Sequence, residues 1–113
     1  MYIEREKMIV KLRLLLDYQC YPVWLYDENG RIVDTLLPEE LRNDKELDKK
    51  FDDLQARYDN LFINNEREFS FVGFRSEEER KRFFDDWNTA AEELKAKTGG
   101  KYEIVDDVKL SCI

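Results

Sequence analysis

Two segments of the chain repeat apolar residues at steps of three and four, the spacing that forms one face of an α-helix. The first covers residues 45–62, and its apolar positions are Leu47, Phe51, Leu54, Tyr58 and Leu61. The second follows Ser76-Glu77-Glu78-Glu79, which matches a capping box, and its apolar positions are Phe83, Trp87, Ala90 and Leu94. Each stripe has to be buried, so the sequence predicts two amphipathic helices and a core that contains Phe51, Leu54, Phe83 and Trp87.

Residues 23–36 carry the clearest β-hairpin signal. Two β-type runs flank Asn29-Gly30, the preferred pair for a two-residue type I′ turn. In that register Tyr26 opposes Val33. Further β-type runs cover residues 69–74 and 101–105.

The N-terminal segment has two interpretations. Residues 3–17 are rich in helix formers, with acidic residues early and basic residues later, which predicts a helix. Residues 10–16 also alternate like a strand, so a sheet lengthened by this segment is an alternative. A fold of two small layers is a further alternative.

The resulting order, α-β-β-α-β-α-β, predicts an α+β fold in a single domain over residues 1–113. We expect a mixed sheet of about four strands that includes the 23–36 β-hairpin, with three helices packed mainly on one face. The final strand–helix–strand segment is compatible with a right-handed crossover between parallel strands.

The composition argues against several functions. The 19 Lys and Arg against 26 Asp and Glu give a net charge of −7, which disfavours nucleic acid and anionic membranes as partners. The chain has no histidine and no P-loop, dinucleotide-binding or CxxC motif, so no catalytic, metal or cofactor site is predicted. Cys20 and Cys112 are expected as free thiols, and the lack of a signal peptide or membrane span predicts a cytoplasmic protein.

Two groups of residues are candidates for binding another protein. The first group is acidic and follows one line of the 45–62 helix: Asp48, Asp52 and Asp59. The second is aromatic, because Trp24 and Tyr26 make the second face of the 23–36 hairpin apolar as well. The plainer alternatives are an ordinary solvated helix face and a hairpin covered by helices on both sides.

A small acidic chain with aromatic residues in a hairpin resembles bacterial immunity proteins and antitoxins in general type. The resemblance implies a non-enzymatic inhibitor that binds a basic partner protein, as a monomer or homodimer. The alternative is a structural or regulatory accessory domain that acts as a homodimer, with its aromatic residues buried between subunits.

Overall fold

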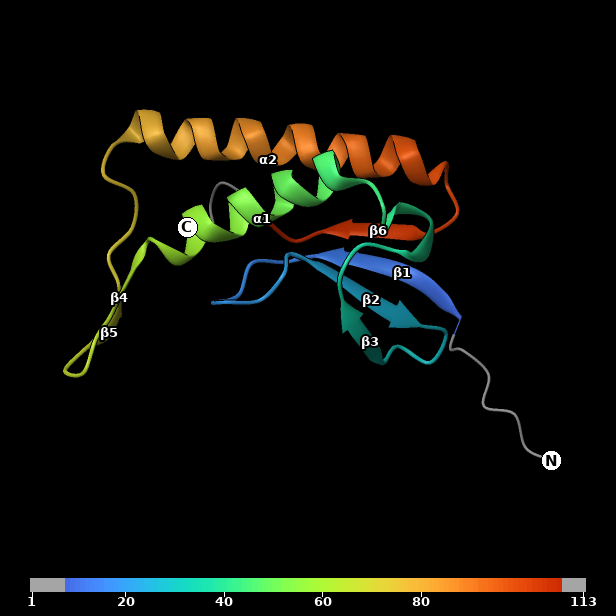
Figure 1. Cartoon of the computed structure of the whole chain (residues 1–113), viewed down its shortest axis with the longest axis horizontal. Coiled ribbons are helices and arrows are strands. Elements are labelled where there is room, and N and C mark those ends of the chain that lie inside the picture. The colour runs from blue at the N-terminus through green and yellow to red at the C-terminus, as the bar shows by residue number, and fades with distance from the viewer. Residues whose placement is uncertain (1–7, 109–113) are drawn as a thin grey trace.

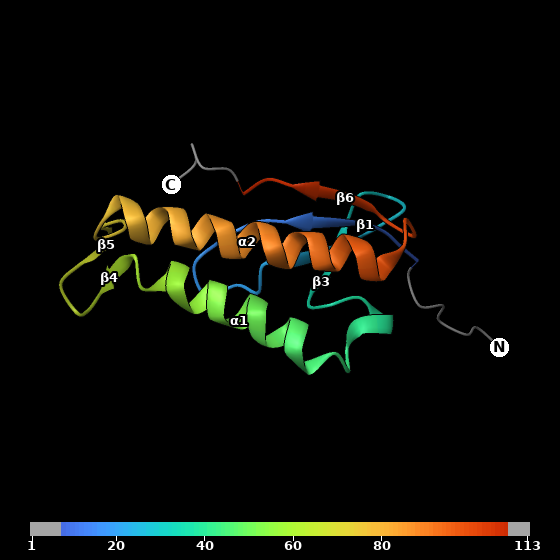
Figure 2. The ribbon, with the colours of Figure 1, turned by 90° about the horizontal axis from the view of Figure 1, so that it is seen from above.

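A four-stranded sheet forms one layer of the structure, and both long helices lie on one of its faces (Figures 1 and 2). The computed structural model describes residues 8–108. The strands of this sheet are β1 (Ile9–Leu14), β2 (Val23–Asp27), β3 (Ile32–Thr35) and β6 (Glu103–Asp106), in the order β3-β2-β1-β6. Strand β1 runs antiparallel to β2 and parallel to β6, so the predicted mixed sheet is confirmed.

The described residues contain two α-helices rather than the three predicted. Helix α1 covers Lys45–Asp59, and α2 covers Glu77–Thr98. The predicted capping residue is confirmed, since Ser76 Oγ accepts a hydrogen bond from the amide of Glu79 at 3.1 Å. Gly99 ends α2 in the left-handed conformation, with φ of 57°. A 3-10 turn, η1 (Glu39–Leu41), precedes α1.

The predicted N-terminal helix is wrong over the described part of the chain, because residues 9–14 form strand β1. This strand is central and pairs on both edges. Its alternation places Leu12 and Leu14, both 0% exposed, in the core, and Lys11 and Arg13 on the opposite face. Hydrogen bonds to two neighbouring strands outweigh the helix propensity of this segment, which is a weak preference in a tertiary context.

The right-handed crossover that the sequence allows between residues 69–74 and 101–105 is absent. Strand β5 (Phe69–Phe71) pairs antiparallel with β4 (Phe62–Asn64) in a separate two-stranded sheet, and β6 instead joins β1. Asn65 closes the turn between β4 and β5, since its Oδ1 accepts hydrogen bonds from the amides of Arg67 and Glu68. A local hairpin therefore forms where a long-range pairing was expected.

The β2–β3 hairpin is present, but its turn has three residues rather than two. The amide of Gly30 donates to the carbonyl of Asp27 at 3.1 Å, and the amide of Asp27 donates to the carbonyl of Arg31 at 2.9 Å. Gly30 has φ of 78°, whereas Gln19 is the one non-glycine residue with positive φ among residues 8–108. This is the pattern of a type I turn followed by a left-handed glycine, not of a type I′ turn. Tyr26 consequently pairs with Ile32 instead of Val33.

The core lies between the helices and the inner face of the sheet (Figure 2). All four residues predicted for it are confirmed, because Phe51, Phe83 and Trp87 are 0% exposed and Leu54 is 2% exposed. The rings of Phe51 and Trp87 meet edge to face, with centroids 5.9 Å apart. The indole Nε1 of Trp87 donates to the carboxylate of Asp106 at 3.2 Å, which joins α2 to the end of β6.

Ion pairs on the exposed side link the two helices. Lys50 of α1 contacts Glu93 of α2 at 2.5 Å. Lys97 contacts Glu93 at 2.9 Å and also pairs with Asp44, the residue that caps α1. Hydrogen bonds from these lysines lower the pKa values of Asp44 and Glu93.

We predict that Gly30→Val lowers the free energy of unfolding by at least about 1 kcal/mol, because a β-branched residue is strained at this positive φ. A Cβ at this position meets no other atom within 4 Å, so the cost comes from the backbone alone. Asn29→Ala is the control and should change stability by less than about 0.5 kcal/mol, because the three-residue turn needs no positive φ there. Urea denaturation measures both. A Gly30→Val protein as stable as the wild type would contradict this turn.

We predict that Phe51→Ala or Phe83→Ala costs about 3–5 kcal/mol, because each ring is fully buried between the helices and the sheet. Val72→Ala, at a side chain 55% exposed, is the control and should cost less than about 1 kcal/mol. Thermal unfolding followed by circular dichroism compares the three proteins. Equal melting temperatures for the Phe51 and Val72 variants would refute this description of the core.

Candidate functional site

Trp24 and Tyr26 lie on the sheet face that is turned away from the helices. Leu25 between them is 1% exposed and belongs to the core, so its two neighbours point to the other side. Helices therefore cover only one side of the β2–β3 hairpin. Tyr26 is nevertheless just 7% exposed, and Trp24 is half-buried. The described structure thus offers less aromatic surface at this point than the sequence suggested.

Basic side chains from β1 pack against Tyr26. Arg13 Nη1 donates to the Tyr26 hydroxyl at 3.3 Å, and Lys11 Nζ lies 4.6 Å from the ring centroid. Arg13 Nε also contacts Asp107 Oδ2 at 2.5 Å, and these two hydrogen bonds raise the pKa of Arg13. The indole Nε1 of Trp24 is buried and makes no hydrogen bond within residues 8–108, which leaves an unpaired donor on this face.

The acidic line on α1 divides into residues with different surroundings. Asp48 Oδ1 accepts a hydrogen bond from the Tyr21 hydroxyl at 2.8 Å. Asp59 Oδ1 accepts from the amide of Gln19 and from Nε2 of Gln55, both at 2.8 Å. Asp48 and Asp59 therefore fasten the loop between β1 and β2 to α1. They lie on the helical side of the sheet, so the structure does not bring them together with Trp24 and Tyr26.

Asp52 is the exposed member of the three predicted acidic residues. Its carboxylate forms no hydrogen bond or ion pair within the described part of the chain. Partial burial raises its pKa, and the charges of Asp48 and Asp53 raise it further. The two neighbouring carboxylates therefore make the surroundings of Asp52 locally negative.

A second apolar surface was not predicted from the sequence. The β4–β5 hairpin projects beyond the C-terminal end of α1, clear of the four-stranded sheet (Figures 1 and 2). We call residues 62–72 the apolar hairpin, because several of its large hydrophobic side chains are exposed: Phe69 (56%), Val72 (55%), Phe71 (49%) and Ile63 (37%). The sequence contains two signals for this hairpin, the turn-forming Asn64-Asn65 pair and the alternation of Phe69 and Phe71. The predicted fold assigns Phe69 and Phe71 to a strand of the main sheet.

A cavity of about 300 Å³ lies at the base of the apolar hairpin. Four segments contribute to it: the chain after β1, the last turn of α1, the hairpin itself and the chain after β6. Its lining residues are Leu15, Leu16, Tyr58, Phe62, Phe71, Asp107 and Val108. Apolar side chains supply most of the wall, which suits an apolar group better than a polar metabolite.

Other chemistry is sparse in the described residues. Across residues 8–108, three or more Asp, Glu, Cys or His side chains do not come together in a group that could hold a metal ion. Cys20 is a half-buried free thiol whose pKa is raised by burial and by the charges of Asp17 and Asp59. Cys112 lies outside the described residues, and so does the expectation about its thiol. Over the same range, each helix is too short or too polar to cross a membrane.

The fold and its surfaces define an α+β protein that presents acidic and apolar patches. The family model of Serratia CdiI immunity protein-like proteins matches residues 10–106. This match spans most of the 113 residues, and the chain belongs to that family. No curated protein matches the chain.

We predict opposite effects on stability for two of the acidic residues. Asp59→Ala should cost about 0.5–1.5 kcal/mol, because it removes the acceptor of the exposed Gln19 backbone amide and one of the two acceptors of Gln55 Nε2, which also donates to the carbonyl of Asp17. Asp52→Asn should instead stabilise the protein by roughly a few tenths of a kcal/mol at pH 7, because it removes a repelled charge. Urea titrations of both variants measure these changes.

The pH dependence supplies the control for Asp52. Its raised pKa means that the folded protein holds this proton more tightly than the unfolded chain does. The wild type therefore loses stability as the pH rises from about 4 through that raised pKa, and Asp52→Asn lacks this loss. The gain in stability from Asp52→Asn should vanish at low pH, where the wild-type carboxyl is protonated in both the folded and the unfolded state. A gain that is the same at both pH values would contradict the electrostatic explanation.

Proposed function

We propose that this protein is an immunity protein that binds a toxin protein and inhibits it without catalysing a reaction. The observation that carries the proposal is the match to the Serratia CdiI immunity protein-like family over residues 10–106. The described surfaces support it, since they offer acidic and apolar contacts suited to a protein partner.

We further propose that the toxin is basic and is attracted by α1. The chain carries a net charge of −7, and Asp52 is exposed beside Asp48 and Asp53. Charges outside the buried centre of an interface act mainly on the rate of encounter. Asp52 therefore assists association, and Asp48 contributes to the same field although it also binds Tyr21.

The remaining predicted contact residues have more limited access to a partner. Trp24 is half-buried and can present only part of its ring, while Tyr26 lies beneath Lys11 and Arg13. Asp59 is engaged by Gln19 and Gln55. We propose that Trp24 touches the partner directly, and that Tyr26 and Asp59 maintain the shape of the surfaces beside them.

Growth protection tests the inhibitor function. An immunity gene sits next to the gene of its toxin, so the protein encoded directly upstream is the probe. Expression of that upstream protein should arrest growth of a test strain, and co-expression of this chain should restore growth. Growth arrest that persists despite abundant folded protein would overturn the proposal. A stable homodimer that leaves the upstream protein unbound would favour the accessory-domain alternative.

We predict that Asp48→Asn combined with Asp52→Asn slows association with this upstream protein by about tenfold at low salt and flattens the salt dependence of the association rate. The control is Glu28→Gln combined with Asp34→Asn, which removes the same charge from the exposed β2–β3 hairpin. Stopped-flow measurements of the association rate over a range of salt concentrations compare the two double variants. Equal slowing by both pairs would show that net charge, and not the acidic line on α1, governs encounter.

A further inference from the structure

We propose that the apolar hairpin and the cavity at its base form the surface that anchors the toxin, and that this surface receives an apolar side chain flanked by basic residues. This inference rests on the proposed immunity function, and it names the surface and the chemistry of the partner.

Ring contacts with the loop after β1 and with α1 hold the apolar hairpin in place. The ring of Phe62 is the centre of the contact, with centroids 5.0 Å from Tyr18, 5.3 Å from Tyr58 and 5.4 Å from Phe69. A two-stranded hairpin is at best marginally stable alone, and these ring contacts supply its support. The hairpin is therefore an ordered part of the surface, although it stands clear of the main sheet (Figure 1).

Apolar surface stays exposed after these supporting contacts are made. Phe69 and Phe71 both contact the ring of Phe62, yet they and Val72, the residue after β5, are each about half exposed. Single exposed hydrophobic residues are common, but a cluster on a projecting element marks an interaction surface. Aromatic side chains at such a place are typical anchors of protein interfaces.

The geometry of the hairpin directs part of this cluster toward the cavity. Phe71 pairs directly with Phe62 across the two strands, so both side chains lie on the same face. Both also line the cavity of about 300 Å³ together with Leu15 and Leu16. An apolar side chain that enters the cavity would cover Phe71 and remove the most exposed part of this wall from water.

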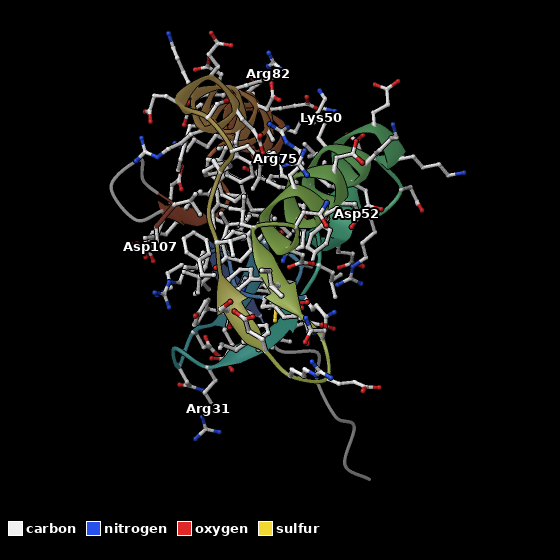
Figure 3. All side chains as sticks on the ribbon, turned by 90° about the vertical axis from the view of Figure 1, so that its left-hand side faces the viewer. Arg31, Lys50, Asp52, Arg75, Arg82 and Asp107 are labelled. Carbon is white, nitrogen blue, oxygen red and sulfur yellow. The ribbon has the colours of Figure 1, made fainter. Side chains whose placement is uncertain are left out.

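The charges around this apolar surface favour a basic partner. Asp17 and Asp59 lie close to Tyr58, since their charges add to the effect of burial in raising the pKa of that phenol. The turn of the hairpin adds the exposed side chains of Glu66 and Glu68, against one basic residue, Arg67. Figure 3 looks onto this end of the molecule and shows Asp52 to one side of the hairpin and Asp107, which pairs with Arg13, to the other. The exposed Arg75 also lies at this end, so the acidic residues outnumber the basic ones but are not alone.

The same charges make a second copy of this chain a poor occupant. A two-fold interface brings identical surfaces together, so each acidic rim would face another acidic rim. Such like-charge contacts oppose association, whereas a cationic protein gains from every one of them. The surface is therefore complementary to a basic protein with an apolar anchor.

Two variants remove this surface in different ways, and one control matches them. Phe69→Ser with Phe71→Ser removes the exposed rings, while Leu16→Trp fills the cavity and leaves the hairpin sequence intact. Ile32→Ser with Val33→Ser removes two similarly exposed apolar residues (51% and 40%) from edge strand β3, away from the cavity. Circular dichroism and the melting temperature establish that each variant is folded.

The rate of dissociation from the purified upstream protein, measured by surface plasmon resonance, is the readout. We expect both surface variants to dissociate at least about tenfold faster than the wild type and the control to dissociate at the wild-type rate, since anchor residues act mainly on the off-rate.

If both surface variants dissociate at the wild-type rate, or if the control dissociates as fast as they do, the inference is wrong. Growth protection by the wild type would then still support the immunity function. Failure of the wild type to protect would overturn both. A wild-type dimer abolished by the Phe69/Phe71 variant would assign the surface to a second copy and also overturn the inference.

Discussion

The rest of the structure depends on the insertion of β1 between β2 and β6. This strand is antiparallel to one neighbour and parallel to the other, so it joins the two ends of the described chain in one sheet. Its inward residues, Leu12 and Leu14, are fully buried and provide the floor on which the helices pack. Without β1 the sheet would separate into the β2–β3 hairpin and an isolated β6, and neither could bury the apolar stripes of α1 and α2.

The position of β1 also organises the two surfaces of the protein. Its outward residues, Lys11 and Arg13, cover Tyr26 and place positive charge on the face without helices. Leu15 and Leu16, which follow β1, line the cavity. The loop after them is bound to α1 through Asp48 and Asp59. Asp59 and the apolar lining of the cavity consequently lie near the apolar hairpin, not beside the aromatic residues of β2.

The candidate site could be predicted from the sequence only in part. The acidic character of α1 follows from the spacing of its aspartates, because residues on one helix keep fixed relative positions. Their differing roles depend on Tyr21, Gln19 and Gln55, and the contacts of Tyr21 and Gln19 come from a loop far away in sequence. The exposure of Phe69 and Phe71 could not be inferred, because a phenylalanine in a β-type run is equally compatible with a core strand.

The sequence by itself determined the elements whose signals are local. Periodicity defined α1 and α2 and their buried residues, the side chain of Ser76 capped α2, and Gly30 marked the turn between β2 and β3. Only the tertiary structure decided whether residues 9–14 form a helix or a strand, which strand pairs with β6, and that β5 turns back onto β4. The physical reason is that helix stripes, caps and turns depend on neighbours within a few residues, whereas strand pairing depends on partners distant in the chain, and these partners override weak local propensities.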